Sequence, residues 1–546
     1  MIKKTIPALW ALLLVAFSFS GCVVYWDWFL DPVGAGGTAS TGGATGSTGG
    51  ASACKPGEIA ACYDGPEGTE GVGLCKPGSK TCVADGVSFG QCEGAILPVA
   101  ENCATPVDDD CDGLAPPCKG IPLWSERAGD TADQFGSSVA VDSAGNVLVT
   151  GTFYSVVDFA GCSMSRIDNG SPGMFVAKLD PAGKCLWAKD AGDAGSQSPL
   201  GIAVDGAGNV LVTGYFFGAM SLDNCSLSNA GGIGLFVAKL DPMGVCQWSE
   251  GADKGTGSSV AVDSSGNVFV VGTFDGTMDL AGCSLAENVV SGPGLFVAKL
   301  DPMGVCQWSK GASGVDIQDA KSLAVDSSGN ILVTGAFSGM MSFAGCSLST
   351  KAPGMFVVKL APMGECQWGR AAGDAGSQYG RGVAVDNAGN ILVTGAFSSV
   401  MDLGCKAPLL NAGPLGLFVT KLDPVGGCQW IKGAGGSGSQ YGRGVAVDST
   451  GNVLVTGSFS GLLSFGNGAI ANAGHEDFFL VKFDAAGGLV WSQWGGGPSD
   501  DLGVGVAVDS AGNVLVTGGF NDTADFGTGP LVSAGGSDVF VAKYAP

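Results

Sequence analysis

Histidine and positive charge are scarce in this 546-residue sequence. Its one histidine is His475, so a general base or metal ligand there would act without a second histidine. Lys and Arg number 26 against 50 Asp and Glu, and the formal net charge of −24 argues against binding to nucleic acid or to anionic membrane surfaces. Charged residues make up only 14% of the chain, whereas glycine, at 95 residues, is abundant, as in tightly turned β structure.

One segment, 139–151, recurs along the chain in nearly unchanged form. Its aspartate returns roughly every 60 residues, which indicates a repeat architecture. We number the repeats 1 to 7 by the copies of this residue, which are Asp142, Asp205, Asp263, Asp326, Asp386, Asp448 and Asp509.

Each repeat is predicted to form two hairpins. In repeat 1, the alternating residues 139–141 and the β-rich run 147–149 predict two strands. Asp142 suits the first position of a type I turn between them, and Gly145 suits the left-handed residue that closes it. A second hairpin follows at 174–187. The sequence therefore predicts four antiparallel strands per repeat.

The two ends of the repeat array are offset. The first six repeats each end in a strand with a tryptophan, and these are Trp187, Trp248, Trp308, Trp368, Trp430 and Trp491. Repeat 7 stops at Tyr544 without one, but Trp124 precedes repeat 1 in the matching register. A ring that pairs its first and last strands explains this offset, whereas a linear solenoid does not. We therefore expect an all-β fold over 119–546: a seven-bladed β-propeller of four-stranded blades, closed by an N-terminal strand.

The repeats resemble the bacterial seven-bladed β-propeller repeat and, more loosely, the NHL-type repeat. The resemblance covers 119–546 and implies the fold alone, because propellers host many unrelated functions.

Ten cysteines occur two to a repeat in repeats 1 to 5, and repeats 6 and 7 have neither. Because the two positions are present or absent together in a chain with an export signal, we expect disulfides within the repeats; free buried thiols are the alternative. The expected pairs are Cys162 with Cys185, Cys225 with Cys246, Cys283 with Cys306, Cys346 with Cys366, and Cys405 with Cys428.

The first residues carry an export signal. Lys3 and Lys4 precede the apolar run 6–19, and we interpret 1–21 as a signal peptide. Residues 19–22, Phe-Ser-Gly-Cys, resemble the lipobox of bacterial lipoproteins, which implies cleavage after Gly21 and lipidation of Cys22. The alternatives are an ordinary signal peptide with an incidental cysteine and an uncleaved anchor.

Lipidation would make this an exported protein, anchored at the outer membrane or cell surface through its lipid alone. Residues 22–53 are then a flexible linker, since 34–53 are almost entirely Gly, Ala, Ser and Thr.

Residues 54–118 form a cysteine-rich module. Its eight cysteines include no Cys-x-x-Cys pair and it has no histidine, so a disulfide framework of open connectivity is favoured over zinc. All nineteen cysteines thus have a lipid or disulfide role, which leaves none as a nucleophile.

Alternating carboxylates followed by glycine lie inside this module at Asp108, Asp110, Asp112 and Gly113 (DDDCDG at 108–113). This spacing is similar to the first half of an EF-hand calcium loop, although Lys119 stands where that loop has its glutamate. The segment 101–113 also resembles a Cys- and Asp-rich metal-binding repeat of secreted bacterial proteins. Calcium at the three aspartates is therefore expected as the cofactor, and a solvated acidic turn is the alternative.

A lysine in the third strand also recurs in every repeat, at Lys178, Lys239, Lys299, Lys359, Lys421, Lys482 and Lys543. With the repeat aspartates it could form a ring of substrate-binding groups, but seven equal copies favour a structural role, in which the lysine reaches a blade edge or a local carboxylate.

Differences between the repeats point to possible ligand contacts. The segments 378–381 and 440–443, both Gln-Tyr-Gly-Arg, precede repeats 5 and 6 and are interpreted as loops that combine Tyr with Arg. Such pairs suit a sugar or peptide ligand, and packing is the alternative. The candidate contacts are Tyr379, Arg381, Tyr441, Arg443 and His475.

Two functions remain open. The favoured one is a non-catalytic surface lipoprotein whose propeller is a binding or structural scaffold for a protein or glycan partner. The alternative is an extracellular propeller hydrolase or lyase that acts on polysaccharide or peptide. No cluster of non-repeat polar residues marks a catalytic site, so no catalytic residue is predicted.

Overall fold

The computed structural model describes residues 54–546 except 67, 99–110, 112–119, 160, 167–169, 192–194, 287, 290–291, 315, 317, 374 and 467–468. The predicted signal peptide, Cys22 and linker lie outside these residues. The regular elements of the described residues are all β-strands, as expected, and none of these residues belongs to a helix long and apolar enough to cross a bilayer. The chain divides into two compact bodies: the described parts of Met1–Asp64 with Pro77–Ile96, and those of Gly65–Lys76 with Leu97–Pro546.

The small body contains one hairpin, in which β1 (Ile59–Cys62) pairs antiparallel with β2 (Gly78–Thr81). Two disulfides stabilise it, Cys54–Cys82 and Cys62–Cys92. A body this small buries little apolar surface, so covalent links carry much of its stability. A further disulfide, Cys75–Cys111, lies within the large body.

Each repeat contributes four antiparallel strands to the large body. The strands of repeats 4 to 7 form separate four-stranded sheets, whereas those of repeats 1 and 2 join in one eight-stranded sheet and those of repeat 3 join hairpin strands in a seven-stranded sheet. The first strands are β4 (Gln134–Val141), β10 (Gln197–Val204), β14 (Gly255–Val262), β21 (Gln318–Val325), β27 (Gln378–Val385), β33 (Gln440–Val447) and β39 (Asp501–Val508). The second strands are β5 (Val147–Phe153), β11 (Val210–Leu222), β15 (Val268–Phe274), β22 (Ile331–Phe337), β28 (Ile391–Phe397), β34 (Val453–Phe459) and β40 (Val514–Phe520).

The third strands are β8 (Gly173–Leu179), β12 (Cys225–Leu240), β19 (Gly294–Leu300), β25 (Gly354–Leu360), β31 (Gly416–Leu422), β37 (Asp477–Phe483) and β43 (Asp538–Tyr544). The fourth strands are β9 (Cys185–Ala191), β13 (Cys246–Asp253), β20 (Cys306–Gly314), β26 (Cys366–Ala372), β32 (Cys428–Ala434), β38 (Leu489–Gly495) and, in repeat 7, β3 (Pro122–Ala128). The predicted four strands per repeat are thus confirmed.

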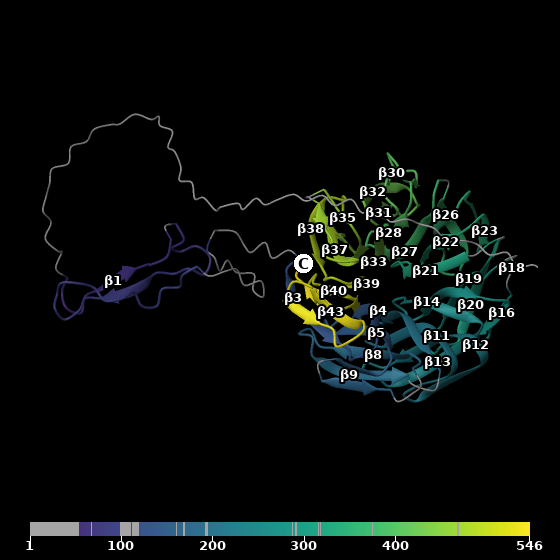
Figure 1. Cartoon of the computed structure of the whole chain (residues 1–546), viewed down its shortest axis with the longest axis horizontal. Helices are drawn as coiled ribbons and strands as arrows, with labels where there is room; N and C mark the ends of the chain where they lie inside the picture. The colour runs from purple at the N-terminus through teal and green to yellow at the C-terminus, as the bar shows by residue number, and fades with distance from the viewer. Residues whose placement is uncertain are drawn as a thin grey trace, which may run out of the picture. The chain divides into compact units, whose positions relative to one another are not determined.

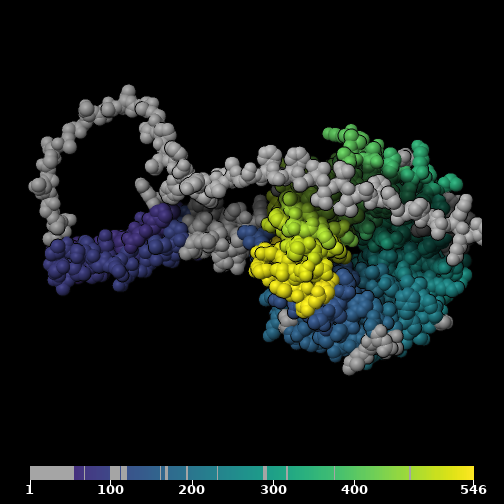
Figure 2. Space-filling view, viewed as in Figure 1, coloured from purple at the N-terminus to yellow at the C-terminus, as the bar shows by residue number. Residues whose placement is uncertain are grey.

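Strand β3 precedes repeat 1 in sequence but belongs to the sheet of repeat 7. It pairs antiparallel with β43, and Trp124 lies opposite Lys543, as Trp187 lies opposite Lys178 in repeat 1. Figure 1 shows the yellow strands β40 and β43 beside the blue strands β4 and β5, and in the space-filling view of Figure 2 the yellow and blue surfaces adjoin. Strand β39 contacts β4 as β33 contacts β39. The first and last repeats are therefore neighbours in space.

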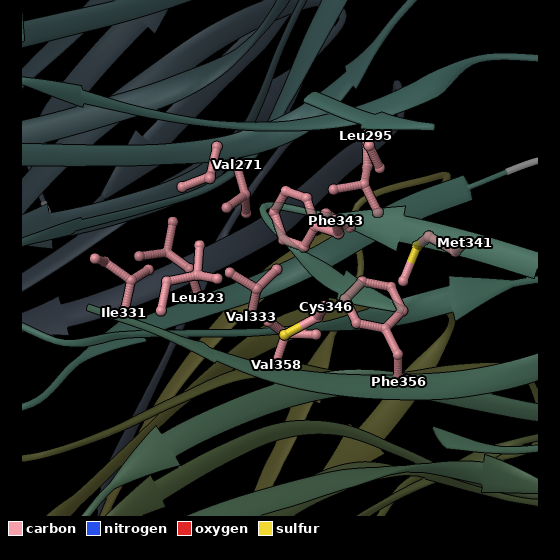
Figure 3. Close-up of a cluster of buried hydrophobic side chains, with 14 of the residues drawn as sticks. Val271, Leu295, Leu323, Ile331, Val333, Met341, Phe343, Cys346, Phe356 and Val358 are labelled. Carbon is pink, nitrogen blue, oxygen red and sulfur yellow. The ribbon is translucent and has the colours of Figure 1, made fainter. Parts of the chain in front are cut away.

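Apolar clusters fill the space between adjacent repeats. The cluster in Figure 3 joins Val271 and Leu295 of repeat 3 to Ile331, Val333 and other residues of repeat 4. The same kind of cluster joins the last repeat to the first, where Val539 and Val541 pack with residues of β4, β5 and β8. Because both faces of the second and third strands are covered in this way, these strands are buried along almost their whole length rather than at alternate residues.

Tryptophans of the fourth strands tie neighbouring repeats together, except between repeats 6 and 7, where the Trp491 indole makes no such bond. The indole Nε1 of Trp124 donates a hydrogen bond to the carbonyl of Pro181, 3.1 Å away in the second turn of repeat 1. The same bond recurs from Trp187 to Pro242, Trp248 to Pro302, Trp308 to Pro362, Trp368 to Pro424, and Trp430 to Ala485. The tryptophan that marks the repeat in sequence therefore links neighbouring sheets.

Small hairpins lie between the second and third strands, and the sequence did not predict them. They are β6 (Val156–Phe159) with β7 (Cys162–Ser165), β16 (Thr277–Leu280) with β17 (Cys283–Ala286), β23 (Met340–Phe343) with β24 (Cys346–Ser349), β29 (Val400–Met401) with β30 (Leu409–Leu410), β35 (Leu462–Leu463) with β36 (Ile470–Ala471), and β41 (Thr523–Asp525) with β42 (Pro530–Val532). In repeat 2 the long strands β11 and β12 form the hairpin themselves. In repeat 3 a further short strand, β18 (Asn288–Val289), pairs with β20.

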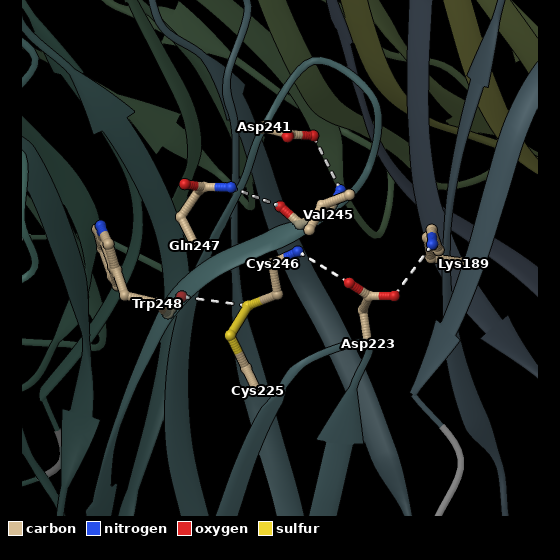
Figure 4. Close-up of a disulfide and its surroundings, with 8 residues drawn as sticks. All are labelled: Lys189, Asp223, Cys225, Asp241, Val245, Cys246, Gln247 and Trp248. Atoms are coloured by element: carbon tan, nitrogen blue, oxygen red, sulfur yellow. Dashed lines mark hydrogen bonds and ion pairs between the residues drawn. A yellow bond between two sulfur atoms is a disulfide. The ribbon is translucent and has the colours of Figure 1, made fainter.

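Disulfides fasten these hairpin segments to the fourth strands in repeats 1 to 5. The structure pairs Cys162 with Cys185, Cys225 with Cys246, Cys283 with Cys306, Cys346 with Cys366, and Cys405 with Cys428. Beside the Cys225–Cys246 bond, Asp223 accepts hydrogen bonds from Lys189 Nζ and the Cys246 amide (Figure 4). Each disulfide therefore links the fourth strand of its repeat to the small hairpin.

Candidate functional site

The carboxylate oxygens of the repeat aspartate accept hydrogen bonds within its own turn. In repeat 1, Asp142 Oδ1 accepts hydrogen bonds from the amides of Ala144 and Asn146, and Oδ2 accepts one from the Asn146 side chain. Gly145 has φ of 82°, the left-handed conformation that favours glycine. The predicted turn is confirmed, and it leaves few acceptor positions on this carboxylate for a ligand.

The repeat lysine takes the remaining position. Lys178 Nζ lies 2.9 Å from Asp142 Oδ2, and the two side chains are 7% and 6% exposed. The same buried ion pair joins Lys239 to Asp205, Lys359 to Asp326, Lys421 to Asp386, Lys482 to Asp448, and Lys543 to Asp509. These contacts bear out the interpretation that the lysine reaches a local carboxylate.

The pairs hold their aspartates ionised. Burial would raise the pKa of Asp142, but hydrogen bonds from Asn146 and Lys178 outweigh it and the pKa lies below its ordinary value. In Asp448 burial is likewise outweighed, there by Thr450 first among several hydrogen bonds, and the pKa falls to about 2. These aspartates therefore stay ionised near neutral pH and do not donate protons there.

Repeat 3 departs from this pattern. Among the described residues there is no ion pair between Lys299 and Asp263, and Lys299 Nζ instead lies 5.1 Å from the ring centroid of Phe269. A cavity of about 460 Å³ opens here, lined by both residues and by the first turn of repeat 4. The lysine and aspartate therefore form a structural ion pair in six repeats, whereas in repeat 3 the lysine lies over an aromatic ring instead.

A different cavity lies where the first strands of all seven repeats meet. It has a volume of about 230 Å³. Every first strand has a β-bulge at the same place; in β27, for example, the register shifts between Gly380 and Gly382. The bulge residues line the cavity, and they are Ser137, Leu200, Ser258, Lys321, Arg381, Arg443 and Val504. Bulges often re-aim a side chain beside a functional site, and here they aim three cations at one space.

Two arginines of the cavity share one aromatic ring. The guanidinium carbons of Arg381 and Arg443 lie 5.9 and 5.5 Å from the ring centroid of Tyr441, within cation–π range. Arg443 also donates to Ser458 Oγ at 3.3 Å and lies 3.8 Å from Glu476 Oε2. Burial, and then the charge of Arg381, lower the pKa of Arg443.

The sequence-predicted contact residues are only partly brought together. Arg381, Tyr441 and Arg443 form one group, whereas Tyr379 sits half-buried on β27 opposite Ala396 and is not among the residues that line the cavity. The His475 side chain is 78% exposed, with Nδ1 3.9 Å from Asp500 Oδ1, and it does not line the cavity either.

The prediction that 378–381 and 440–443 are loops was wrong. Both lie in first strands, β27 and β33, in which Gln378 and Gln440 are fully buried opposite Phe397 and Phe459. The glycine in each segment belongs to a bulge rather than to a turn, so the arginine that follows points to the centre. Sequence reasoning also missed Lys321, which could have been found by aligning the bulge residue across the repeats.

Sequence reasoning also missed buried carboxyls in repeats 6 and 7. Asp501 occupies the position that Gln134 and Gln378 hold in other repeats and is fully buried. Its burial, with smaller contributions from the charges of Asp477 and Asp500, raises its pKa to about 7 against the hydrogen bonds it accepts. Asp477 is also fully buried, and burial raises its pKa as well.

Metal ligands can be assessed only in the described part of the chain. There, no three His, Cys, Asp or Glu side chains are grouped so that they could hold a metal ion. The calcium prediction concerns Asp108, Asp110 and Asp112, which lie outside the described residues.

Comparison with known proteins agrees with a propeller repeat. A family model described as a beta-propeller repeat matches residues 429–458. An uncharacterized WD repeat-containing protein of Acanthamoeba polyphaga mimivirus is 22% identical over 535 residues, which cover 78% of this chain and 38% of that protein. The chain thus spans well under half the length of this relative.

Solved propellers are more distantly similar. The Neurospora crassa Pan2 WD40 domain has a TM-score of 0.39 at 10% identity, covering 79% of this chain and 98% of that domain. The Dos1 propeller has a TM-score of 0.37 at 8% identity, with coverages of 78% and 95%.

Proposed function

We propose that this chain is a non-catalytic binding scaffold, built as a seven-bladed β-propeller that β3 closes, for a protein or glycan partner outside the cytoplasm. The observation that carries the proposal is that the polar residues common to the repeats are used to stabilise the fold. Six Asp–Lys pairs are buried in ion pairs that fix the turns, so they have no free groups for a reaction. Three cations that differ between repeats, Lys321, Arg381 and Arg443, line one arc of the central cavity instead.

Three features support a closed ring. β3 pairs with β43, the apolar cluster between repeats 7 and 1 matches those between other neighbours, and Trp124 bonds to the turn of repeat 1. Closure pairs the free edge of β43 and covers the apolar faces that the first and last repeats of an open array would expose, and it gives a rigid scaffold with one central space.

The proposed setting follows from the cysteines. Disulfides in repeats 1 to 5 and in the small body are typical of an oxidising compartment. We add the finer proposal that Cys22 is lipidated and holds the protein at the outer membrane or cell surface. Intact mass of the membrane-extracted protein tests this, because a diacylated Cys22 adds the mass of its acyl chains and Cys22→Ser abolishes it.

One observation supports the alternative, an extracellular hydrolase or lyase. Asp501, with a pKa of about 7, lies near a second buried carboxyl, Asp477, and paired carboxyls with separated pKa values serve as acid and base in glycosidases. Both side chains, however, are fully buried. A polysaccharide or peptide would have to open the strands of repeats 6 and 7 to reach them, so we prefer binding without turnover.

The test is a binding screen run beside an activity panel. The exported chain is offered to glycan arrays and to envelope proteins, and in parallel to polysaccharide and peptide substrates for hydrolysis or elimination. We expect a bound partner and no turnover. Turnover that disappears in Asp501→Asn but persists in the exposed control Asp253→Asn would establish the enzyme instead.

A further inference from the structure

The central cavity concentrates positive charge in a strongly acidic protein. Bulge residues of three consecutive repeats are cations, namely Lys321, Arg381 and Arg443, whereas the other four repeats place Ser, Leu or Val there. The chain as a whole has a net charge of −24. A seven-fold repeat thus has one positive arc, and such asymmetry is what recognition of a single ligand requires.

Neighbouring carboxylates neutralise the three cations of this positive arc only in part. Lys321 Nζ lies 2.6 Å from Asp319 Oδ2, and Arg443 lies 3.8 Å from Glu476, a distance longer than a hydrogen bond. Arg381 makes no ion pair among the described residues. The buried Nε atoms of Arg381 and Arg443 have no hydrogen-bond partner. Buried guanidinium donors without acceptors are costly, so an acceptor that enters the cavity gains by satisfying them.

We propose that the cavity is an oxyanion site, in which Arg381 and Arg443 bind a carboxylate or phosphate group and Lys321 adds charge at its exposed side. The site rests on the proposed closed propeller, because the first strands of all seven repeats form its wall. The planar guanidinium group matches a pair of oxygens in either anion and binds them with two charge-assisted hydrogen bonds. Tyr441 lies within cation–π range of both arginines, which helps to hold them in place and limits the side-chain entropy that they lose on binding.

The size of the cavity and the net charge decide what can enter. About 230 Å³ holds a small anion or the terminal group of a longer ligand, not a folded partner. The protein's net negative charge does not prevent entry, because at physiological salt charges more than about 8 Å apart are largely screened. Within the cavity, the local cations dominate.

Calorimetric titration of the full exported chain tests the site with three probes. Inorganic phosphate and glucuronate supply the same oxyanion chemistry from two sources, and glucose is the uncharged control. One variant is Arg381→Gln, because Arg381 is the arginine that makes no ion pair in the described part of the chain. The other is Lys321→Gln, because the Lys321 side chain is half-exposed and its removal carries little risk to folding. Arg370→Gln is the matched control, since Arg370 is exposed on β26 outside this cavity.

We expect at least one of the two anions to bind and glucose not to bind. Arg381→Gln should weaken binding by about tenfold or more and Lys321→Gln by less, while Arg370→Gln changes it less than about twofold. Binding of glucuronate alone would identify an acidic sugar as the source, and binding of phosphate alone a phosphorylated ligand. The site is refuted if neither anion binds, or if binding survives both cavity variants. Either result leaves the scaffold proposal standing, because catalytic turnover and the closure of the ring test that proposal separately.

Discussion

Trp124 lies opposite Lys543, so the first strand of the propeller is the neighbour of the last. The pair repeats the arrangement of Trp187 and Lys178 within a single repeat. The Trp124 indole and the Lys543 ammonium both donate to the carbonyl of Pro181, at 3.1 and 3.3 Å. One pair of residues therefore joins the two ends of the large body and ties both to repeat 1.

The buried ion pairs give a first prediction about stability. Lys178→Met should lower the free energy of unfolding by about 3–5 kcal/mol, because it leaves the buried Asp142 carboxylate without its cation. Chemical denaturation followed by tryptophan fluorescence measures this loss. Lys299→Met is the matched control, since Lys299 holds the same position without the ion pair, and it should cost less than about 1 kcal/mol. Equal losses in the two variants would show that the ion pair is not the cause.

The disulfides give a second prediction. Replacing both Cys225 and Cys246 by Ser should lower the free energy of unfolding by about 3 kcal/mol, because the bond restricts a loop of moderate length in the unfolded chain. The control is reduction: dithiothreitol should destabilise the parent protein more than the double variant, which has one bond fewer to lose. If the variant unfolds at the same denaturant concentration as the parent, this bond contributes nothing to stability.

The buried Asp501 gives a prediction about pH. Its pKa is about 7 in the folded protein and near 4 when unfolded, so between these values the native state holds a proton that the unfolded state has lost. The contribution of Asp501 is fully present below about pH 4 and is lost as the pH rises through 7, at a slope of up to about 1.4 kcal/mol per pH unit.

Unfolding curves from pH 5 to 8 test this prediction. Asp501→Asn, which cannot ionise, should flatten the decline, whereas the exposed control Asp253→Asn should leave the slope as in the parent. Parallel pH profiles for the parent and Asp501→Asn would mean that this carboxyl is ionised in the folded protein at all of these pH values.

Local chemistry made much of the fold predictable. Asp142 and Gly145 specify a turn wherever they recur, and the offset of Trp124 foretold the strand that pairs with β43. The small hairpins escaped prediction because strands as short as Val400–Met401 have no periodicity to detect.

The candidate site was predictable only in part. Arg381 and Arg443 stood out because they break the repeat, but Gly380 suggested a loop, since a bulge and a turn both use glycine. Lys321 lacks the neighbouring tyrosine of the other two repeats, so only an alignment of the repeats at the bulge would have placed it in the cavity. Asp501 was missed for a similar reason: nothing in the sequence tells a buried aspartate from an exposed one.

Hydrogen–deuterium exchange of β3 tests the closed ring most directly. Amides of a strand that is paired and packed exchange only when the structure opens, whereas those of an unattached segment exchange within seconds. The comparison is with β9 and β32, the fourth strands of repeats 1 and 5, whose places in their sheets match that of β3. We predict that peptides covering 122–128 are protected as strongly as those covering 185–191 and 428–434. Rapid exchange of 122–128 beside protected β9 and β32 would contradict the closed ring and the central site built on it.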